Sequence, residues 1–544
     1  MSNKILKGTF WLTGAAFISK FLGMIYIIPF NELVGPKGGA LYYYAYNPYT
    51  ILISISTVGI PMAISKIVSK YNSLGDYETG LRIFRASFLL MIVTGFLAFI
   101  TLFISAEWLA SKFVLDDVLN NKVEDVKQVI RMVSFALLIV PAMSVVRGFF
   151  QGNQKMEPTA ISQVVEQIVR IVFLLIAAFI VIKVYQGSIT LAVSFATFAA
   201  FVGALASCFV LLLAWKKRHT FIKKEKKARK KTPPYVTTKA LMIELLSYAG
   251  PFVLVGITIP LYQLVDSFTF NRAMIVSGNA EIAELSLSAI TFYGHKLIII
   301  PVTLATGLSL TIVPALTESF TKRNRPKLIS EVNQSLQIVL FFVIPAVVGL
   351  MALSYEAYGS LFGMENLSLT GDLLRWYAPV ALLFALYTVS SAILQGINEQ
   401  RYALISLTAG FLVKVIFNSM LIHMFLGKGS IIATGLAVGV AVIINLWRIQ
   451  QAINFSYIQT LKRTLFMVIF SIIMFVFIYV TKYLFGFFLP FEESRFAAMI
   501  MLIIGVAVGA IVYLWLTYKS TLMEFVLGST NILDRFRRKK RANR

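Results

Sequence analysis

The sequence lacks the residues from which most catalytic and metal centres are built. It holds a single cysteine, Cys208, among 544 residues, which excludes a disulfide framework and a cysteine-based metal site. Its three histidines lie at least 76 residues apart, so no local metal-binding motif exists. The one Gly-Lys pair is followed by Gly429 and not by Ser or Thr, so the phosphate-binding loop of an ATPase is absent. We therefore expect no catalytic residue, no metal and no bound cofactor.

Charge is also scarce, because only 14% of the residues are charged while 58% are hydrophobic. The mean hydropathy is +0.79. Soluble domains are about 25% charged and about 45–50% apolar. Too few charges are present to cover the outside of a soluble core. The composition predicts an all-α polytopic membrane protein without a long polar domain, so any activity takes place at or within the membrane.

Fourteen apolar stretches are long enough to cross a bilayer, since a span needs about 20 mostly apolar residues. The first is too long for the core of a signal peptide, so we interpret it as an uncleaved helix. The predicted spans lie near 9–30, 41–65, 84–106, 129–150, 160–183, 189–214, 246–268, 286–312, 334–354, 374–395, 402–426, 430–450, 464–484 and 496–518.

The positive residues fall mainly on one side of these spans. With the N-terminus inside, cytoplasmic segments hold 35 of the 50 Lys and Arg residues, external segments 11 and the spans four. This asymmetry predicts that both termini are cytoplasmic. The densest runs, 216–231 and 535–544, either attract anionic membrane lipids or simply fix the orientation. Nucleic-acid binding is not expected, because no folded aromatic-bearing domain accompanies these runs.

The two halves of the chain resemble each other at an offset of 244 residues. Residues 151–173 match 395–417. Both segments start with Gln-Gly, and Arg170 aligns with Lys414. Six spans in each half give a parallel repeat, which in transporters places the substrate between two lobes. The predicted organisation is a first lobe, a basic linker, a second lobe, two extra spans and a basic tail, at 1–215, 216–240, 241–455, 456–520 and 521–544.

Six ionisable residues lie in the interior of the predicted spans, when charges close to a span end are counted with the adjacent segment. Such residues are rare within a membrane and often functional. Several have structural alternatives: Lys20 with Asp266 as an ion pair, Glu166 with Arg170 one turn apart on a helix, and Lys296 extending toward the outer surface. The four basic and two acidic residues are Lys20, Arg170, Lys296, Lys414, Glu166 and Asp266.

The sign of this set indicates an anionic cargo. A site for cationic drugs would favour carboxylates, whereas surplus Lys and Arg suit phosphate. The residues alone therefore predict a two-lobed transporter for an anionic, phosphorylated substrate. Tyr42, Tyr43, Tyr44 and Tyr46 start the second span, and they fit either an interfacial aromatic belt or a surface for stacking sugars.

Four stretches resemble a known family. They are ISKFLGMIYIIPF at 18–30, VGIPMAISKIVSKY at 58–71, VRGFFQGNQKMEPTAISQVVEQIVRI at 146–171 and FYGHKLIIIP at 292–301. Together they resemble the polysaccharide-transporter branch of the multidrug/oligosaccharidyl-lipid/polysaccharide exporter superfamily. More narrowly, the chain resembles the lipid II flippases of the YtgP/SpoVB-type branch in Gram-positive, Bacillus-like bacteria.

The resemblance implies two six-helix lobes around a cationic cavity, in a multi-pass protein of the bacterial cytoplasmic membrane. It implies transport without enzymatic chemistry: alternating access moves lipid II, an undecaprenyl-diphosphate-linked sugar, to the outer leaflet for peptidoglycan synthesis. The extra spans would form a groove for the lipid tail. We expect a monomer driven by the membrane potential or an ion gradient, with cell-wall synthesis enzymes as candidate partners.

The family pattern supports only some of the charges. Lys20 and Lys296 keep its cations, and Arg170 and Lys414 are our candidates to replace those that are missing. The departures from the pattern are Tyr26, Gly39, Leu52, His295 and Ile299. Some relatives bind sodium through the seventh and eleventh spans, where only Asp266 and Asn418 match.

Two alternatives remain open. A flippase for another undecaprenyl-diphosphate-linked polysaccharide, or a sporulation paralogue, would share almost every feature above. A polyprenyl-phosphate glycosyltransferase would need a carboxylate in an external loop, and Asp116 and Asp117 are its candidates.

Overall fold

The computed structural model describes Ala15, most of 18–57, 59–227 and 237–527, apart from positions 74, 115–118, 120 and 154. These residues form helices joined by short turns, and no strand occurs among them. Lys20, Asp116, Asp117 and the tail from residue 528 lie outside the described part, as do the side chains of 217–236. The prediction of an all-α protein is confirmed.

The chain forms two compact units. The first comprises Met1–Tyr293 with Val415–Ser430. Its helical segments, including the 3-10 turn η1 and the π-helical turns η2 and η3, are α2 (Ile27–Thr57), α3 (Gly59–Ser73), α4 (Tyr77–Phe113), α5 (Val123–Ser134), η1 (Phe135–Leu138), α6 (Val140–Gly152), α7 (Glu157–Phe179), η2 (Ile180–Val184), α8 (Ile189–Lys227), α9 (Thr238–Gly256), α10 (Thr258–Val276), α11 (Ala283–Ser288) and η3 (Ala289–Gly294).

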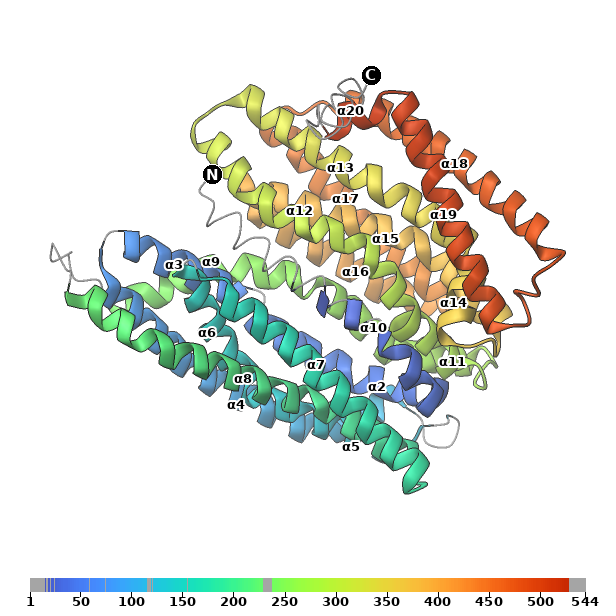
Figure 1. Ribbon diagram of the computed structural model, residues 1–544, viewed down its shortest axis with the longest axis horizontal. Helices are drawn as coiled ribbons and strands as arrows, with labels where there is room; N and C mark the ends of the chain where they lie inside the picture. Colours follow the sequence, from blue (N-terminus) through green and yellow to red (C-terminus); the bar gives the residue numbers. More distant parts are fainter. Residues whose placement is uncertain are drawn as a thin grey trace, which may run out of the picture. The chain divides into compact units, whose positions relative to one another are not determined.

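The second unit comprises Gly294–Lys414 with Ile431–Arg544, so α16 and α17 each contribute to both units. Within it α18 and α19, drawn in red, run side by side and pack on α13 (Figure 1). Its helices are α12 (His295–Thr321), α13 (Arg325–Ala352), α14 (Ser354–Phe362), α15 (Leu367–Gly396), α16 (Gln400–Phe425), α17 (Gly427–Ile453), α18 (Ile458–Gly486), α19 (Arg495–Lys519) and α20 (Leu522–Leu527).

Polar side chains mark where some of these helices begin. Asp76 accepts a hydrogen bond from the backbone N–H of Thr79 at 3.1 Å and caps α4. Asn324 caps α13 in the same way through Lys327 at 3.2 Å. Each cap satisfies a backbone donor that the first helical turn leaves unpaired. Both capping residues lie in segments between predicted spans, just before the next apolar stretch begins.

Each unit has its own apolar core. In the first unit α3, α4, α6 and α9 meet at Ile64, Ile83, Phe149 and Leu245. This contact places α9 in the first unit, although the predicted lobe boundary puts 241 and the residues after it in the second lobe. That boundary rests on the sequence repeat and stays a prediction about the repeat.

The core of the second unit lies where the two extra C-terminal helices meet α13. Its buried residues include Phe341, Met474, Ile478 and Tyr513 from α13, α18 and α19. Tyr513 also donates a hydrogen bond from Oη to the backbone carbonyl of Phe341 at 2.9 Å. These helices therefore belong to the second unit and are not loose additions.

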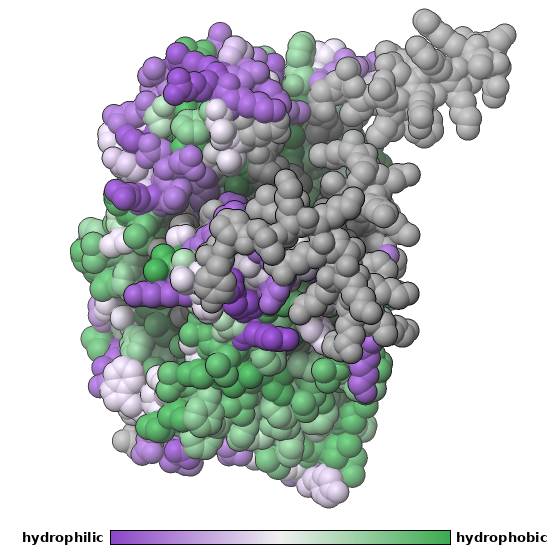
Figure 2. Space-filling view, turned by 90° about the vertical axis from the view of Figure 1, so that its left-hand side faces the viewer, coloured by the Kyte–Doolittle hydropathy of each residue, from purple (hydrophilic) through white to green (hydrophobic). Residues whose placement is uncertain are grey.

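Large apolar side chains cover the outside of the helices. On α7, Ile168, Val172 and Ile176 are 45%, 49% and 54% exposed, spaced four residues apart along one face. Figure 2 shows broad hydrophobic surface on one face of the molecule, with hydrophilic residues gathered away from it. Apolar surface of this extent requires lipid, because soluble monomers expose only small patches.

Twelve candidate spans lie in the described residues, against fourteen expected. One of them, Phe21–Asn72, has 52 residues and covers the first two predicted spans. It is broken at Gly35, whose φ of 61° and ψ of −170° are not helical. The predicted seventh span is divided between α9 and α10, each of 19 residues. The membrane-spanning fold is confirmed, whereas the count of fourteen stays a prediction.

Candidate functional site

Arg170, on α7, lies against a cluster of tyrosines on α2. Its Nη2 donates a hydrogen bond to Tyr42 Oη at 2.8 Å, and its guanidinium carbon is 5.0 Å from the ring centroid of Tyr46. The two rings are stacked, with centroids 5.1 Å apart. Tyr42, Tyr46 and Tyr49 follow a spacing of four and three residues, which places them on one face of α2. The arginine remains partly exposed, so it presents a fixed positive charge beside aromatic rings.

The neighbouring tyrosines join α2 to α10 and do not form an interfacial belt. Tyr43 Oη donates to the backbone carbonyl of Gln263 at 2.7 Å, and Asn271 Nδ2 donates to Tyr44 Oη at 2.6 Å. Tyr42, Tyr43 and Tyr44 are 2%, 4% and 0% exposed. A belt requires rings at the membrane surface, so that interpretation is wrong for these three residues.

Glu166 has a different partner from the one that the helical spacing suggests. Its Oε2 lies 2.6 Å from Nη2 of Arg147, which comes from α6. Arg147 also donates to Ser162 Oγ at 3.0 Å and to Ser207 Oγ at 2.8 Å. Arg147 thus links α6 to Glu166 on α7 and to Ser207 on α8, and this pairing corrects the expectation that Glu166 neutralises Arg170. The proposed contact of Glu166 with substrate stays untested.

The sequence reasoning missed Arg147. The charge count assigns it to a cytoplasmic segment, although it lies inside the Val123–Gly152 candidate span with its side chain 13% exposed. Its position within the predicted span 129–150 was the one available signal.

Lys296 lies in the middle of a span and not near its outer end. The Ala283–Leu308 span places 13 residues before it, a helical rise of about 20 Å. That rise exceeds the length of a lysine side chain, so the position favours a cation within the membrane, and extension toward the outer surface stays an untested alternative. A π-helical turn, Ala289–Gly294, directly precedes it. Such turns frequently mark functional sites.

His295, beside this lysine, has a local role. Its Nδ1 lies 3.2 Å from Tyr377 Oη, which joins α12 to α15. The contact is that of a packing histidine held by a hydrogen bond between two helices.

Lys414 is fully buried, with 0% of its surface exposed. Its Nζ donates to Thr434 Oγ1 of α17 at 2.7 Å. Its counterpart in the repeat, Arg170, is instead partly exposed and contacts tyrosines. The two matched cations therefore have different surroundings, and Lys414 needs a rearrangement before it can meet a ligand.

Asp266 is the centre of a buried polar group in the first unit. It is 4% exposed and accepts hydrogen bonds from Asn418 Nδ2 at 2.9 Å and from Ser430 Oγ at 2.7 Å. Asn418 also donates to Thr269 Oγ1 at 2.7 Å. The structure thus brings together the two residues that the sequence names for ion coupling. It adds Thr269 and Ser430, which no pattern in the sequence indicates as neighbours of Asp266.

The candidate site residues are divided between the two units. Arg170, Glu166, Asp266 and Asn418 belong to the first unit, whereas Lys296 and Lys414 belong to the second. Among the described residues no group of three or more His, Cys, Asp or Glu side chains is arranged to hold a metal. The chemistry available is binding by fixed cations, aromatic rings and oxygen-rich polar groups.

Comparisons with known proteins are consistent over the full chain. Residues 5–320 match the family described as polysaccharide biosynthesis protein. The chain is 45% identical over 532 residues to lipid II flippase MurJ of Bacillus subtilis (strain 168), covering 97% of both chains. It is 26% identical over 413 residues to stage V sporulation protein B of the same organism, covering 75% of this chain and 76% of that one. A solved structure of lipid II flippase MurJ in an inward closed conformation matches with a TM-score of 0.67 and 17% identity, covering 95% of this chain and 99% of that one.

Proposed function

The chain belongs to the polysaccharide biosynthesis protein family and, within it, to the lipid II flippases, and on this premise we propose that it carries lipid II from the inner to the outer leaflet of the cytoplasmic membrane. It is a transporter and not an enzyme, so no bond is made or broken. The headgroup crosses by alternating access while the lipid tail stays in the bilayer. The carried sugar serves peptidoglycan synthesis.

The observation that carries the mechanism is Arg170. The residue is partly exposed within a membrane span, and its guanidinium is held by Tyr42 and Tyr46. Arginine binds phosphate through two parallel N–H donors, which suits a diphosphate. The adjacent aromatic rings provide a surface on which a sugar can stack. Lys296 supplies a second cation at mid-depth, on the other unit.

The buried polar group around Asp266 is our candidate for ion coupling. Asp266, Thr269, Asn418 and Ser430 supply carboxylate, hydroxyl and amide oxygens, the ligands that hard cations prefer. Asn418 Oδ1 is buried and accepts no hydrogen bond from the described residues. A cation gradient acting here, or the membrane potential acting on the buried lysines and arginine, would drive the return step. A charge moving through the field contributes about 2.3 kcal/mol per 100 mV.

The test measures which leaflet holds lipid II. In cells lacking every other lipid II flippase, the wild-type chain should restore outer-leaflet delivery, and Arg170→Gln should not. The matched control is Lys183→Gln, which removes one charge from an exposed position just beyond α7. Failure of the well-expressed wild-type chain to restore delivery would overturn the assignment.

The resemblance to a sporulation protein keeps a second candidate in view. That relative is 26% identical, against 45% for the lipid II flippase. Competition between lipid II and another undecaprenyl-diphosphate-linked glycan in reconstituted vesicles separates the two. The glycosyltransferase alternative has no support, because the family is one of flippases.

Several finer points remain part of this proposal. We infer that both termini are cytoplasmic, since the 35 positive residues of the inner segments set that orientation. We also infer that the chain acts as a monomer beside cell-wall synthesis enzymes, with its basic linker and tail against anionic lipids.

A further inference from the structure

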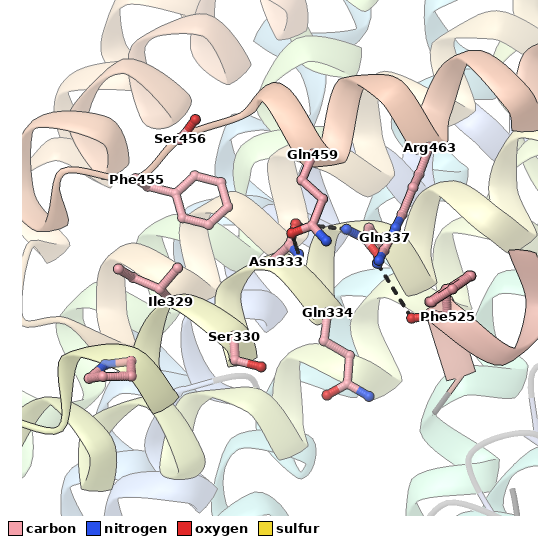
Figure 3. Close-up of a pocket in the computed structure, with 11 residues that line it drawn as sticks. Ile329, Ser330, Asn333, Gln334, Gln337, Phe455, Ser456, Gln459, Arg463 and Phe525 are labelled. Atoms are coloured by element: carbon pink, nitrogen blue, oxygen red, sulfur yellow. Dashed lines mark hydrogen bonds between the residues drawn. The ribbon is translucent and has the colours of Figure 1, made fainter. Parts of the chain in front are cut away.

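A polar cavity of about 480 Å³ opens within the second unit (Figure 3). It lies among the first turns of α13, the turn that precedes α18, the first turns of α18, and α20. None of its lining residues is named by the transport mechanism, so its chemistry calls for a separate explanation.

The lining combines neutral hydrogen-bonding groups with a single charge. Four carboxamides line it, and Arg463 is the only charged side chain that the described residues contribute to the lining. A lining in which the described residues supply one cation and no acid favours an anionic ligand. Carboxamides both donate and accept, so they suit hydroxyl groups. The carboxamide residues are Asn333, Gln334, Gln337 and Gln459.

Arg463 is held in place but keeps free donors. Its Nη1 donates to Gln337 Oε1 at 2.5 Å and to the backbone carbonyl of Phe525 at 3.4 Å. Its guanidinium carbon is 5.3 Å from the ring centroid of Phe525, which fixes its plane. Both of these hydrogen bonds use Nη1, so within the described residues Nε and Nη2 are left for a ligand.

Among the other polar groups of the cavity, some are engaged in hydrogen bonds and others are not. Asn333 is engaged, since Nδ2 donates to Gln459 Oε1 at 3.0 Å and Oδ1 accepts from Thr460 at 2.7 Å. The side chains of Ser330 and Gln334 make no hydrogen bond with the described residues, and Figure 3 shows both on the α13 side of the cavity. The cavity thus has a rigid wall on one side and unpaired donors and acceptors on the other.

The position of the cavity corresponds to the headgroup layer of the membrane. Helix α18 has 29 residues, a length of about 43 Å, which matches a bilayer of about 40–45 Å with its headgroups. Gln459 and Arg463 belong to its first two turns. The start of α13 lies beside them, as the Asn333–Gln459 hydrogen bond shows. Both helices follow segments that we predict to be cytoplasmic.

We propose that this cavity binds the headgroup of a membrane lipid that carries a phosphate next to hydroxyl groups. The phosphate meets Nε and Nη2 of Arg463, and the hydroxyls meet Gln334 and Ser330. Two sources share this chemistry: a phosphatidylglycerol-type lipid of the inner leaflet, and a lipid-linked sugar waiting at the cytoplasmic side. The proposal does not depend on transport, because it concerns the binding of a lipid by the protein when no lipid is being moved across the membrane.

The test measures lipid retention by native mass spectrometry of the full chain from nanodiscs. One set holds dioleoyl-phosphatidylglycerol in phosphatidylcholine, and the other holds lipid II in phosphatidylcholine. We expect Arg463→Met to lose retention of one of these lipids by about tenfold. The matched control is Lys462→Met, which removes the same charge from the adjacent exposed position of α18 and lines no part of the cavity.

A second variant distinguishes cavity binding from loss of folding. Gln334→Trp fills the cavity while leaving Arg463 in place, and it should reduce retention with an unchanged melting temperature. Loss of phosphatidylglycerol alone identifies a membrane lipid, whereas loss of lipid II alone identifies the lipid-linked sugar. Unchanged retention of both lipids in Arg463→Met, or an equal loss in Lys462→Met, overturns the proposal.

Discussion

Arg170 differs from an ordinary membrane arginine in having its donors oriented before a ligand arrives. Tyr42 accepts from Nη2 and the Tyr46 ring lies beside the guanidinium plane. Lysine keeps the charge at this position but presents a point charge without a planar pair of donors. We expect Arg170→Lys to keep the protein folded and to lower the rate of lipid II delivery by about tenfold, roughly 1.4 kcal/mol.

The measurement compares delivery rates with melting temperatures for Arg170→Lys, Arg170→Gln and Lys183→Gln. Arg170→Gln should deliver lipid II more slowly than Arg170→Lys, because it loses the positive charge as well as the planar pair of N–H donors. If all three variants deliver lipid II at the wild-type rate, Arg170 does not contact the diphosphate.

The Arg147–Glu166 pair makes an energetic prediction of its own. Removing one member of a buried pair leaves the other charge unpaired, which is more costly than removing both. Because both side chains are partly accessible, at 13% and 24%, we expect Glu166→Gln to lower the stability by about 2 kcal/mol. The double variant Arg147→Met, Glu166→Gln should recover part of that loss.

Thermal unfolding of the two single variants and the double variant in detergent provides the double-mutant cycle. Strictly additive losses would show that the two side chains do not interact.

At this scale the sequence located charged residues within the spans but did not give their partners. Glu166 and Arg170 are both in spans, but the spacing rule considers one helix only, whereas the partner of Glu166 comes from α6. For Asp266 the structure shows two donors, Asn418 and Ser430, whereas Lys20, its alternative ion-pair partner, lies outside the described residues. Partners from distant segments depend on packing, which a local pattern does not contain.

At the scale of elements, the close approach of α7 and α8 depends on Gly203. A Cβ at this position would lie 2.8 Å from the backbone oxygen of Glu166 and 3.0 Å from Cβ of Arg170. A larger side chain must therefore push α7 away and displace Arg170. Overpacking of this kind costs about 1–3 kcal/mol. We expect Gly203→Leu to lower both the melting temperature and the delivery of lipid II.

Gly439→Leu on α17 is the matched control, because a Cβ there meets nothing within 4 Å. Equal effects of the two substitutions would mean that leucine acts through helix propensity and not through the α7–α8 contact. Melting temperature and leaflet assay together separate these outcomes.

The helices themselves were well predicted, since long apolar runs have few alternatives in a membrane. The sequence predicted an interruption around Gly35, which lies between the first two predicted spans at 9–30 and 41–65. It did not predict the division between α9 and α10 after Gly256. Hydropathy averages over about twenty residues, so it cannot locate an interruption at one residue.

At the scale of the whole molecule, the charge asymmetry and the helices give the same topology only under two conditions. The Phe21–Asn72 segment must cross the membrane twice, turning at Gly35 and Pro36, because 52 helical residues would be about 78 Å long. The α9–α10 pair must cross once, because 39 residues carry the chain from the basic linker at 216–240 to the turn at 277–282. Each condition decides the side on which every later loop lies.

The single cysteine makes this topology testable by labelling. In a Cys208→Ser background, Asn279→Cys lies after α10 and should react with a membrane-impermeant maleimide in intact cells. Arg323→Cys lies after α12 and should react only once the membrane is permeabilised. If Asn279→Cys is also protected in intact cells, α9 and α10 form a re-entrant pair. The inner and outer assignments of all later segments would then exchange, and the 35 positive residues could no longer be reconciled with one cytoplasmic side.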